Sequence, residues 1–214
     1  MCGRMTLHDE QALLDLLEKH FEIEDFSFHD LPRYNIAPKQ MLWTIIYYGK
    51  RFRVGQISWG MMITSKDKSY FNINAKKESL ETFRFFKDLY QHKRCLILLD
   101  GYYEWQDQGD FKQPFYVFDR LKKTMLGAAL FNKDENGFHT TLITQEPIET
   151  LIHIHHRMPL LLTPHEGIHY LKEGVLPKTS EKLAISYHEV STKVNQVKFD
   201  DATLIDAFDP FSVG

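Results

Sequence analysis

Apolar residues recur along the chain in two periods, one typical of helices and one typical of strands. Helical spacing joins four apolar residues near the N-terminus: Leu13, Leu14, Leu17 and Phe21. This stripe predicts a helix over residues 8–20, with Thr6 or Asp9 as its N-cap. A second helix is predicted over residues 79–91. Ser79 would cap it, and four apolar side chains would face inward: Leu80, Phe83, Phe86 and Tyr90.

Two further helices are predicted from proline and capping signals. Pro147 opens a short helix, because proline fits the first turn of a helix. Thr163-Pro-His-Glu166 reads as a capping box with proline at the first helical position, so another helix should follow it.

Runs of β-branched and aromatic residues predict strands over most of the remaining chain. The expected extended segments are 33–38, 41–48, 51–59, 94–105, 115–121, 124–132, 138–144, 158–162 and 184–191. Gly49-Lys50, Lys122-Lys123 and Asn136-Gly137 are the expected turns. Hairpins with peripheral helices predict an α+β fold with a mainly antiparallel sheet curled towards a barrel. We expect a single domain over residues 2–210.

The composition excludes several classes of protein. The chain has 214 residues, of which 43% are hydrophobic and 26% are charged, which is usual for a globular protein. No apolar run approaches the roughly 18 residues of a membrane span, and no signal peptide is evident. Cys95 lies in an apolar run and is read as a buried thiol rather than a disulfide partner of Cys2. We therefore expect a reduced, cytoplasmic protein that acts as a monomer.

Charge is unevenly distributed, although the net charge is only −3. Residues 5–32 contain eight acidic residues and one lysine, whereas residues 66–94 contain eight basic residues and four acidic ones. The basic segment could follow a phosphate backbone, or it could be solvated surface.

Cys2 offers two nucleophiles once Met1 has been removed. The α-amine has an ordinary pKa of about 7.7–8.0 and the thiol one of about 8.5, so both react near neutrality. An aldehyde suits this pair, because the amine forms an imine and the thiol then closes a five-membered thiazolidine ring. The alternative is a passive cysteine near the end of the chain.

Glu104 and the histidines are the other candidates for chemistry. Glu104 lies among aromatic residues, which disfavour its charged form and raise its pKa towards a value useful for acid–base catalysis. His153, His155 and His156 lie within four residues, but neither a strand nor a helix lets all three converge on a metal. We therefore expect one histidine to handle protons and no metal or other cofactor to be needed. Asn74 could bind a substrate oxygen or simply hold a turn.

Seven short stretches follow one another along the chain: Met1-Cys-Gly-Arg4; Tyr34-Asn-Ile-Ala-Pro38 with Gln40; Trp59-Gly60; Asn74-Ala75 with Glu78; Arg94-Cys-Leu-Ile97; Asp100-Gly-Tyr-Tyr-Glu-Trp105; and Ile154-His155 with Arg157-Met-Pro159. In this order they resemble the SRAP family, whose members process abasic sites and crosslink themselves to damaged DNA. The resemblance extends from residue 2 to about residue 205.

The resemblance implies that Cys2 is the covalent nucleophile and that Asn74, Glu104 and His155 surround it. It suggests that Arg4 and the basic residue at position 76 contact DNA phosphates. Position 76 is Lys76, where the family usually has arginine, so the bidentate fork of arginine is missing. The other basic residues that we expect to contact DNA are Lys77, Arg84 and Arg157.

A stacking aromatic residue is harder to assign. The family tends to have tryptophan shortly after its Trp-Gly element, but residues 64–68 contain none, which leaves Tyr70 or Phe71.

The expected function is therefore binding to single-stranded DNA at an abasic site, followed by a covalent crosslink that shields the lesion, in the setting of the SOS response to DNA damage. A slower lyase reaction and self-cleavage of the Met1–Cys2 bond are further activities that the resemblance implies. Two alternatives remain: a hydrolase with a cysteine nucleophile and His155 as its base, and a plain DNA-binding module in which Cys2 is dispensable.

Overall fold

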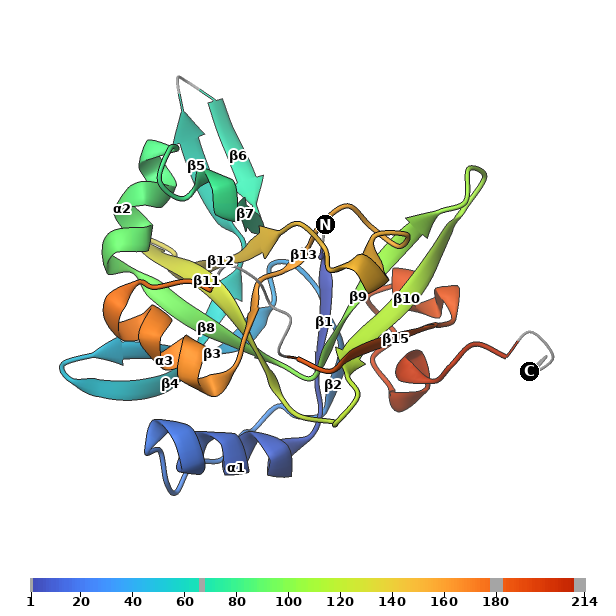
Figure 1. The fold of residues 1–214 in the computed structure, drawn as a ribbon, viewed down its shortest axis with the longest axis horizontal. Coiled ribbons are helices and arrows are strands. Elements are labelled where there is room, and N and C mark those ends of the chain that lie inside the picture. Colours follow the sequence, from blue (N-terminus) through green and yellow to red (C-terminus); the bar gives the residue numbers. More distant parts are fainter. Residues whose placement is uncertain (1, 66–67, 178–182, 210–214) are drawn as a thin grey trace.

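Two sheets meet at the N-terminal strand, and the chain passes from one sheet to the other at Asp100 (Figure 1). The computed structural model describes residues 2–65, 68–177 and 183–209. The first sheet has the order β15–β10–β9–β1–β2. Its strands are β1 (Arg4–Leu7), β2 (Arg33–Ile36), β9 (Gly101–Asp107), β10 (Lys112–Asp119) and β15 (Ile185–Glu189). Neighbouring strands in it are antiparallel.

The second sheet curls into a barrel. Its path runs β12–β4–β3–β8–β11, and a further pairing of β11 with β12 closes the ring. Closure removes free sheet edges, which would otherwise expose unpaired backbone groups. The ring strands are β3 (Met41–Tyr48), β4 (Arg51–Trp59), β8 (Arg94–Leu99), β11 (Met125–Asp134) and β12 (Gly137–Gln145). Three short strands attach to it: β7 (Asn74–Lys76), β13 (Met158–Pro159) and β14 (Leu161–Leu162). The expected α+β fold with a barrel-like, mainly antiparallel sheet is therefore confirmed.

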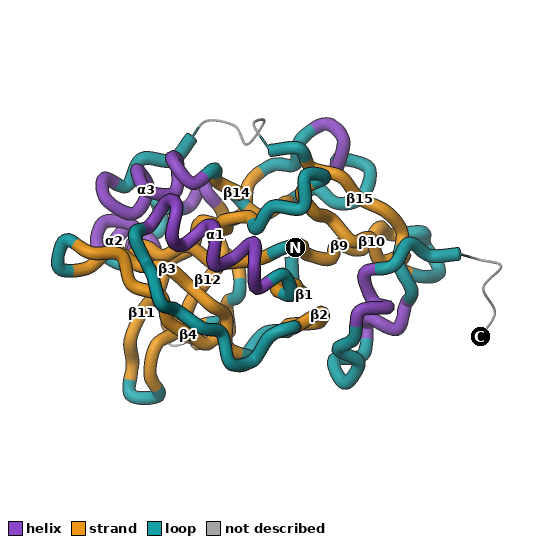
Figure 2. Tube along the Cα trace, turned by 90° about the horizontal axis from the view of Figure 1, so that it is seen from below, coloured by secondary structure: helices purple, strands orange, loops and turns teal. Residues whose placement is uncertain are grey.

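In the described part of the chain, three α-helices lie around the barrel and a separate hairpin projects from it (Figures 1 and 2). The helices are α1 (Glu10–Phe21), α2 (Arg84–His92) and α3 (Pro164–Glu173), and the hairpin pairs β5 (Met61–Ser65) with β6 (Lys68–Asn72). Short 3-10 helices are η1 (Lys77–Ser79), η2 (Glu149–Leu151), η3 (Thr192–Asn195) and η4 (Ala202–Ile205). No helix of the described residues is long and apolar enough to cross a bilayer.

Local signals predicted two of the helices well. Asp9 caps α1 by accepting a hydrogen bond from the N–H of Ala12, and the apolar stripe of α1 enters the main core. Thr163 and Glu166 form the expected capping box at the start of α3. Both features depend on residues within one helical turn, which explains why the sequence reveals them.

The second helix begins later than expected. Ser79 ends η1, and α2 begins only at Arg84, after Phe83 has adopted an extended conformation. Phe83 is 37% exposed rather than buried, whereas Leu80 and Phe86 enter the core as expected. The backbone N–H of Phe83 donates to the carbonyl of Ser79, and this hydrogen bond closes a turn just before the helix.

The single strand expected over residues 94–105 is in fact two strands in different sheets. Asp100 separates them and accepts hydrogen bonds from the backbone N–H groups of His8 (2.6 Å) and Asp9 (2.9 Å). Its other oxygen accepts from the hydroxyl of Thr124 at 3.0 Å. Gly101 follows, where a Cβ atom would meet the Tyr116 ring at 2.3 Å, so this corner requires glycine. Because β9 belongs to the first sheet and pairs with β1, Glu104 lies near the N-terminal strand and not in the barrel.

Candidate functional site

Cys2 lies beside Glu104 because of the pairing between β1 and β9. In this antiparallel ladder Arg4 is opposite Tyr103 and Met5 is opposite Tyr102. Continued towards the N-terminus, this register puts Gly3 opposite Glu104 and Cys2 opposite Trp105, so Cys2 lies within one residue of Glu104 along the ladder. Cys2 is completely buried, and its thiol donates to the carbonyl of Arg4 at 3.7 Å. Burial, followed by the negative charge of Glu104, raises the pKa of the Cys2 thiol well above its usual value.

Asn74 reaches the same place from the barrel sheet. It begins β7, which runs parallel to β12 with Asn74 opposite Leu142. Its Nδ2 donates to the backbone carbonyl of Cys2 at 2.9 Å, and the side chain is buried. Its Oδ1 is also buried and has no hydrogen-bond partner among the described residues. The amide therefore fixes the backbone of Cys2 and keeps an acceptor within the site.

Glu104 is a buried carboxyl group with a strongly shifted pKa. It is 3% exposed, and burial raises its pKa to about 7. The expectation that aromatic surroundings would raise this pKa agrees with the direction and the cause found here. Close to neutrality the group is divided between its acidic and basic forms, so it can accept or donate a proton.

His155 completes the arrangement from a fourth segment of the chain. It follows η2, and Figure 1 shows this golden segment passing beside the N-terminal end of β1. Its Nδ1 lies 4.0 Å from Oε2 of Glu104 and accepts from the backbone N–H of Arg157 at 3.0 Å. The same Nδ1 also lies 3.2 Å from the carbonyl oxygen of Arg157. In the tautomer in which Nδ1 accepts from the Arg157 N–H, Nε2 carries the ring proton.

Burial lowers the pKa of His155 to about 4, so its ring is neutral at pH 7. The contact with Glu104 is therefore not an ion pair. A neutral imidazole can act as a hydrogen-bond donor or as a base.

The other two histidines of the cluster have different neighbours. The centroid of the His156 ring lies 4.2 Å from that of the His155 ring, whereas His153 packs against Phe115 and Tyr187. Within the described part of the chain, no three His, Cys, Asp or Glu side chains are grouped closely enough to hold a metal ion.

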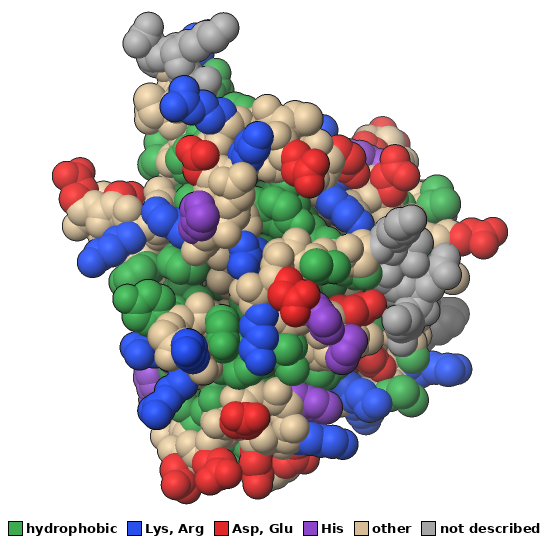
Figure 3. Space-filling view, turned by 60° about the vertical axis from the view of Figure 1, so that its left-hand side comes forward, with side chains coloured by type: hydrophobic (Ala, Val, Ile, Leu, Met, Phe, Trp, Pro, Cys, Tyr) green, Lys and Arg blue, Asp and Glu red, His purple; other side chains and the backbone are tan. Residues whose placement is uncertain are grey.

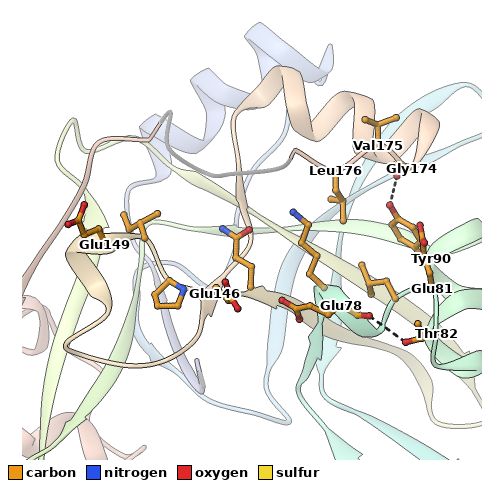
Figure 4. A pocket seen from close by; sticks show the side chains of 14 residues that line it. Glu78, Glu81, Thr82, Tyr90, Glu146, Glu149, Gly174, Val175 and Leu176 are labelled. Atoms are coloured by element: carbon orange, nitrogen blue, oxygen red, sulfur yellow. Dashed lines mark hydrogen bonds between the residues drawn. The ribbon is translucent and has the colours of Figure 1, made fainter.

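An open cavity of about 410 Å³ leads to this site, with Glu104, Trp105, Lys112, His155 and Asn195 around it. A larger cavity of about 850 Å³ lies nearby, between η1, α2 and the end of α3 (Figure 4). Four glutamates line the larger one: Glu78, Glu81, Glu146 and Glu149. Their charge opposes a phosphate, and none of the four candidate residues lines this cavity, so we assign the chemistry to the smaller opening.

Two of the arginines expected to contact DNA have protein partners. Arg157 donates to both carboxylate oxygens of Glu78, at 3.0 and 2.9 Å, and to the carbonyl of Thr144 at 2.6 Å. Arg4 donates to Oδ1 of Asn35 at 2.7 Å and to backbone carbonyls of residues 194 and 195. These bonds give both residues a structural role, and their phosphate contacts remain predictions.

Among the described residues of the basic segment, some are exposed and others have protein partners. Lys76 and Arg84 are exposed, while Lys77 donates to the carbonyl of Pro177 at 2.6 Å. Lys66, which we counted in this segment, lies outside the described residues. Basic and acidic side chains are interspersed over the face shown in Figure 3. Tyr70 and Phe71 are 54% and 44% exposed, on the hairpin strand β6.

Sequence reasoning overlooked Tyr102 and the pairing of Glu78 with Arg157. Tyr102 precedes Glu104 by two residues, so strand alternation puts both side chains on one face of β9. That signal was available in the sequence. The ion pair was not, because 79 residues separate its partners.

Comparison with known proteins agrees with this arrangement. The profile of the family described as SOS response associated peptidase (SRAP) matches residues 1–197. The chain is 29% identical to abasic site processing protein YedK of Escherichia coli K12, over 96% of this chain and 99% of that protein. It is 33% identical to abasic site processing protein YoqW of Bacillus subtilis, over 97% of this chain and 100% of that protein.

Solved structures share the fold. A phage-related protein from Bordetella bronchiseptica matches with a TM-score of 0.69 and 22% identity, over 88% of this chain and 94% of that one. A protein from Bacteroides thetaiotaomicron matches with a TM-score of 0.68 and 18% identity, over 97% and 100% of the two chains. With its family profile matched over nearly its whole length, the chain belongs to the SOS response associated peptidase (SRAP) family.

Proposed function

We propose that this protein binds single-stranded DNA at an abasic site and bonds covalently to the sugar through Cys2. Relatives of nearly the same length are named abasic site processing proteins. The observation that carries the proposal is the convergence of Cys2, Asn74, Glu104 and His155 from four separate segments. No exogenous cofactor enters the proposed reaction.

The reaction begins with removal of Met1, which frees the α-amine of Cys2. The amine adds to the aldehyde of the ring-opened sugar, and loss of one water molecule leaves an imine. The thiol sulfur then bonds to the imine carbon, the thiol proton is released, and the imine nitrogen takes up a proton. The product is a thiazolidine ring, so that amine, thiol and aldehyde have combined with loss of one water.

Glu104 is suited to the proton transfers of this sequence. The thiol of Cys2 is protonated in its buried setting, so ring closure needs an acceptor for its proton. Glu104 has a pKa of about 7 and lies close enough for its charge to act on the thiol. It can take the thiol proton in one step and return a proton in another.

His155 has a different role in the proposal. In the tautomer with the proton on Nε2, its neutral ring can donate to the sugar oxygen as the closed sugar opens to the aldehyde. Asn74 orients the sugar through its buried amide. In this division His155 acts from its neutral form, because its lowered pKa keeps the ring uncharged at pH 7.

Ring closure within one residue should be faster than β-elimination from the imine, which would cut the DNA strand. The thiol and the imine belong to the same residue, and well-oriented intramolecular reactions reach effective molarities of about 10⁵ M or more. We propose lyase activity as a slower branch from the imine and self-cleavage of the Met1–Cys2 bond as the activating step. One chain supplies every group, so a monomer suffices, and a reduced thiol suits the cytoplasm.

The test is the intact mass of the protein after incubation with an abasic single-stranded oligonucleotide. We expect one adduct, equal to the protein without Met1 plus the oligonucleotide minus one water. An oligonucleotide with a tetrahydrofuran analogue is the matched control, because it lacks the aldehyde but keeps the backbone. Cys2→Ala should form no stable adduct while retaining most DNA affinity, since phosphate contacts dominate binding. A stable adduct of normal yield from Cys2→Ala would refute the proposal.

Two further arms separate the alternatives. A protein with its α-amine acetylated should lose the adduct, whereas a hydrolase with a thiol nucleophile would retain activity. Cys2→Ser keeps the amine, so imine-derived strand cleavage should persist without the stable ring. If the protein were a plain DNA-binding module, the wild type and all the variants would bind DNA with equal affinity, and none would form an adduct.

A further inference from the structure

Tyr102 is a buried phenol for which the proposed chemistry has no role. Its side chain is 0% exposed, and its hydroxyl has no hydrogen-bond partner among the described residues. Buried polar groups are nearly always hydrogen-bonded, either to protein or to ordered water. The neighbouring Tyr103 follows this rule, since its hydroxyl donates to the carbonyl of Tyr34 at 2.8 Å. The hydroxyl of Tyr102 therefore requires a partner outside the protein, such as an ordered water molecule.

The position of Tyr102 in β9 directs it towards Glu104. Residues two apart in a strand share a face, so Tyr102 and Glu104 lie together while Tyr103 belongs to the second apolar cluster on the other face. Burial raises the pKa of the Tyr102 phenol well above its usual value, and the charges of Glu104 and then Cys2 raise it further. The phenol is therefore within electrostatic reach of both reacting groups.

A small cavity lies beside both Tyr102 and Glu104. It measures about 10 Å³, and Tyr102, Glu104, His155 and Arg157 line it together with four apolar side chains. A space of this size is at the lower limit for one water molecule, and a buried water needs two to four polar partners. Tyr102 and Glu104 supply two such partners, and the small volume leaves no room for a second water.

We propose that Tyr102 is a positioning residue for Glu104, and that its hydroxyl donates to a single water in this cavity which in turn donates to the Glu104 carboxylate. Hydrogen bonds to the ionised form of a carboxyl group favour that form. Tyr102 thereby limits the rise in the pKa of Glu104 that burial causes. Its effect on adduct formation rests on the proposed function, in which ionised Glu104 accepts the thiol proton.

The test compares Tyr102→Phe with Tyr103→Phe, a matched control that removes a buried hydroxyl from the opposite face of the same strand. The pKa of Glu104 is read from carboxyl ¹³C chemical shifts of labelled glutamate, with Glu104→Gln to assign the signal. Tyr102→Phe should raise this pKa, and Tyr103→Phe should leave it unchanged. A rise of about one pH unit would reduce ionised Glu104 at pH 7 from about half to about a tenth. Adduct formation should then slow about fivefold at pH 7 and hardly at all at pH 9.

A second variant keeps the hydroxyl in place. Replacing Tyr102 with 3,5-difluorotyrosine makes the phenol a stronger donor and should lower the pKa of Glu104. An unchanged or lowered pKa in Tyr102→Phe would overturn the proposal, and so would an equal rise in Tyr103→Phe. The NMR titration needs no DNA. If the wild-type protein formed no adduct, the proposed function would fail while the link between Tyr102 and Glu104 could still be confirmed.

Discussion

Replacing Glu104 with glutamine should make the stability of the protein less sensitive to pH. Burial raises the pKa of Glu104 from its ordinary value of 4.5 to about 7. A carboxyl group whose pKa is raised by folding binds more protons in the folded state than in the unfolded state. Its contribution to stability is fully present below pH 4.5 and is lost as the pH rises through 7. Glutamine has nearly the same shape and does not titrate.

The size of the effect follows from the pKa interval. The difference of 7 − 4.5 = 2.5 pH units, at about 1.4 kcal/mol per unit, gives a total of about 3 kcal/mol. Most of this loss falls between pH 5 and pH 8, where it amounts to about 2.5 kcal/mol. No reduction for solvent screening is needed, because the side chain is 3% exposed.

The assay is urea unfolding of the wild-type protein and Glu104→Gln at pH 5, 6, 7 and 8. We expect the stability of the wild type relative to the variant to fall by about 2–3 kcal/mol across this range. Exposed Glu135, when replaced by glutamine, provides the control for the loss of one carboxyl group. A difference that stays constant within about 0.5 kcal/mol, or that moves in favour of the wild type as pH rises, would refute the argument from burial.

Three further predictions concern the site and the DNA path. His155→Ala should slow adduct formation by about 10²–10⁴-fold, measured by denaturing gel, and His156→Ala should have little effect; equal small losses would make both surface residues. Asn74→Ala leaves a buried carbonyl oxygen without its donor, so it should cost about 1–3 kcal/mol in urea unfolding as well as adduct yield; full stability would contradict this. The double variant Lys76→Ala/Arg84→Ala should reduce the log–log salt slope of DNA binding by about 1.4, measured by fluorescence anisotropy, while adduct yield recovers at saturating DNA. An unchanged slope would show that the DNA path lies elsewhere.

The elements that the sequence predicted well are those stabilised by neighbouring residues. The caps of α1 and α3 act over three or four residues, and the hairpin of β3 and β4 turns at Gly49 and Lys50 as expected. Both turn residues have positive φ angles, of 61° and 64°. Such signals need no knowledge of the rest of the molecule.

The errors arose where distant contacts decide the structure. The apolar run after Arg94 looked continuous with the aromatic run that follows, but Asp100 binds the start of α1 and turns the chain into the other sheet. The late start of α2 has a similar origin, since Leu80 is buried while Phe83 is left at the surface. Periodicity does not reveal which of two neighbouring apolar residues the core will accept.

For the candidate site, the sequence alone indicated the chemical types and, through the family resemblance, the residues Cys2, Asn74, Glu104 and His155. It also indicated why the pKa of Glu104 should rise, because aromatic neighbours are visible in the sequence. Only the tertiary structure decided how these residues meet. The pairing of β1 with β9 brings Cys2 to Glu104, and Asn74 binds the carbonyl of Cys2 across 72 residues.

The tertiary structure also decided which charges are committed to the protein itself. Arg4 and Arg157 look like phosphate ligands in the sequence, yet their guanidinium groups bind partners that lie 31 and 79 residues away. The neutral state of His155 is likewise a result of burial between segments that are remote in the chain. A linear sequence specifies donors, acceptors and apolar surface, whereas hydrogen bonding and desolvation depend on which of them the fold brings together.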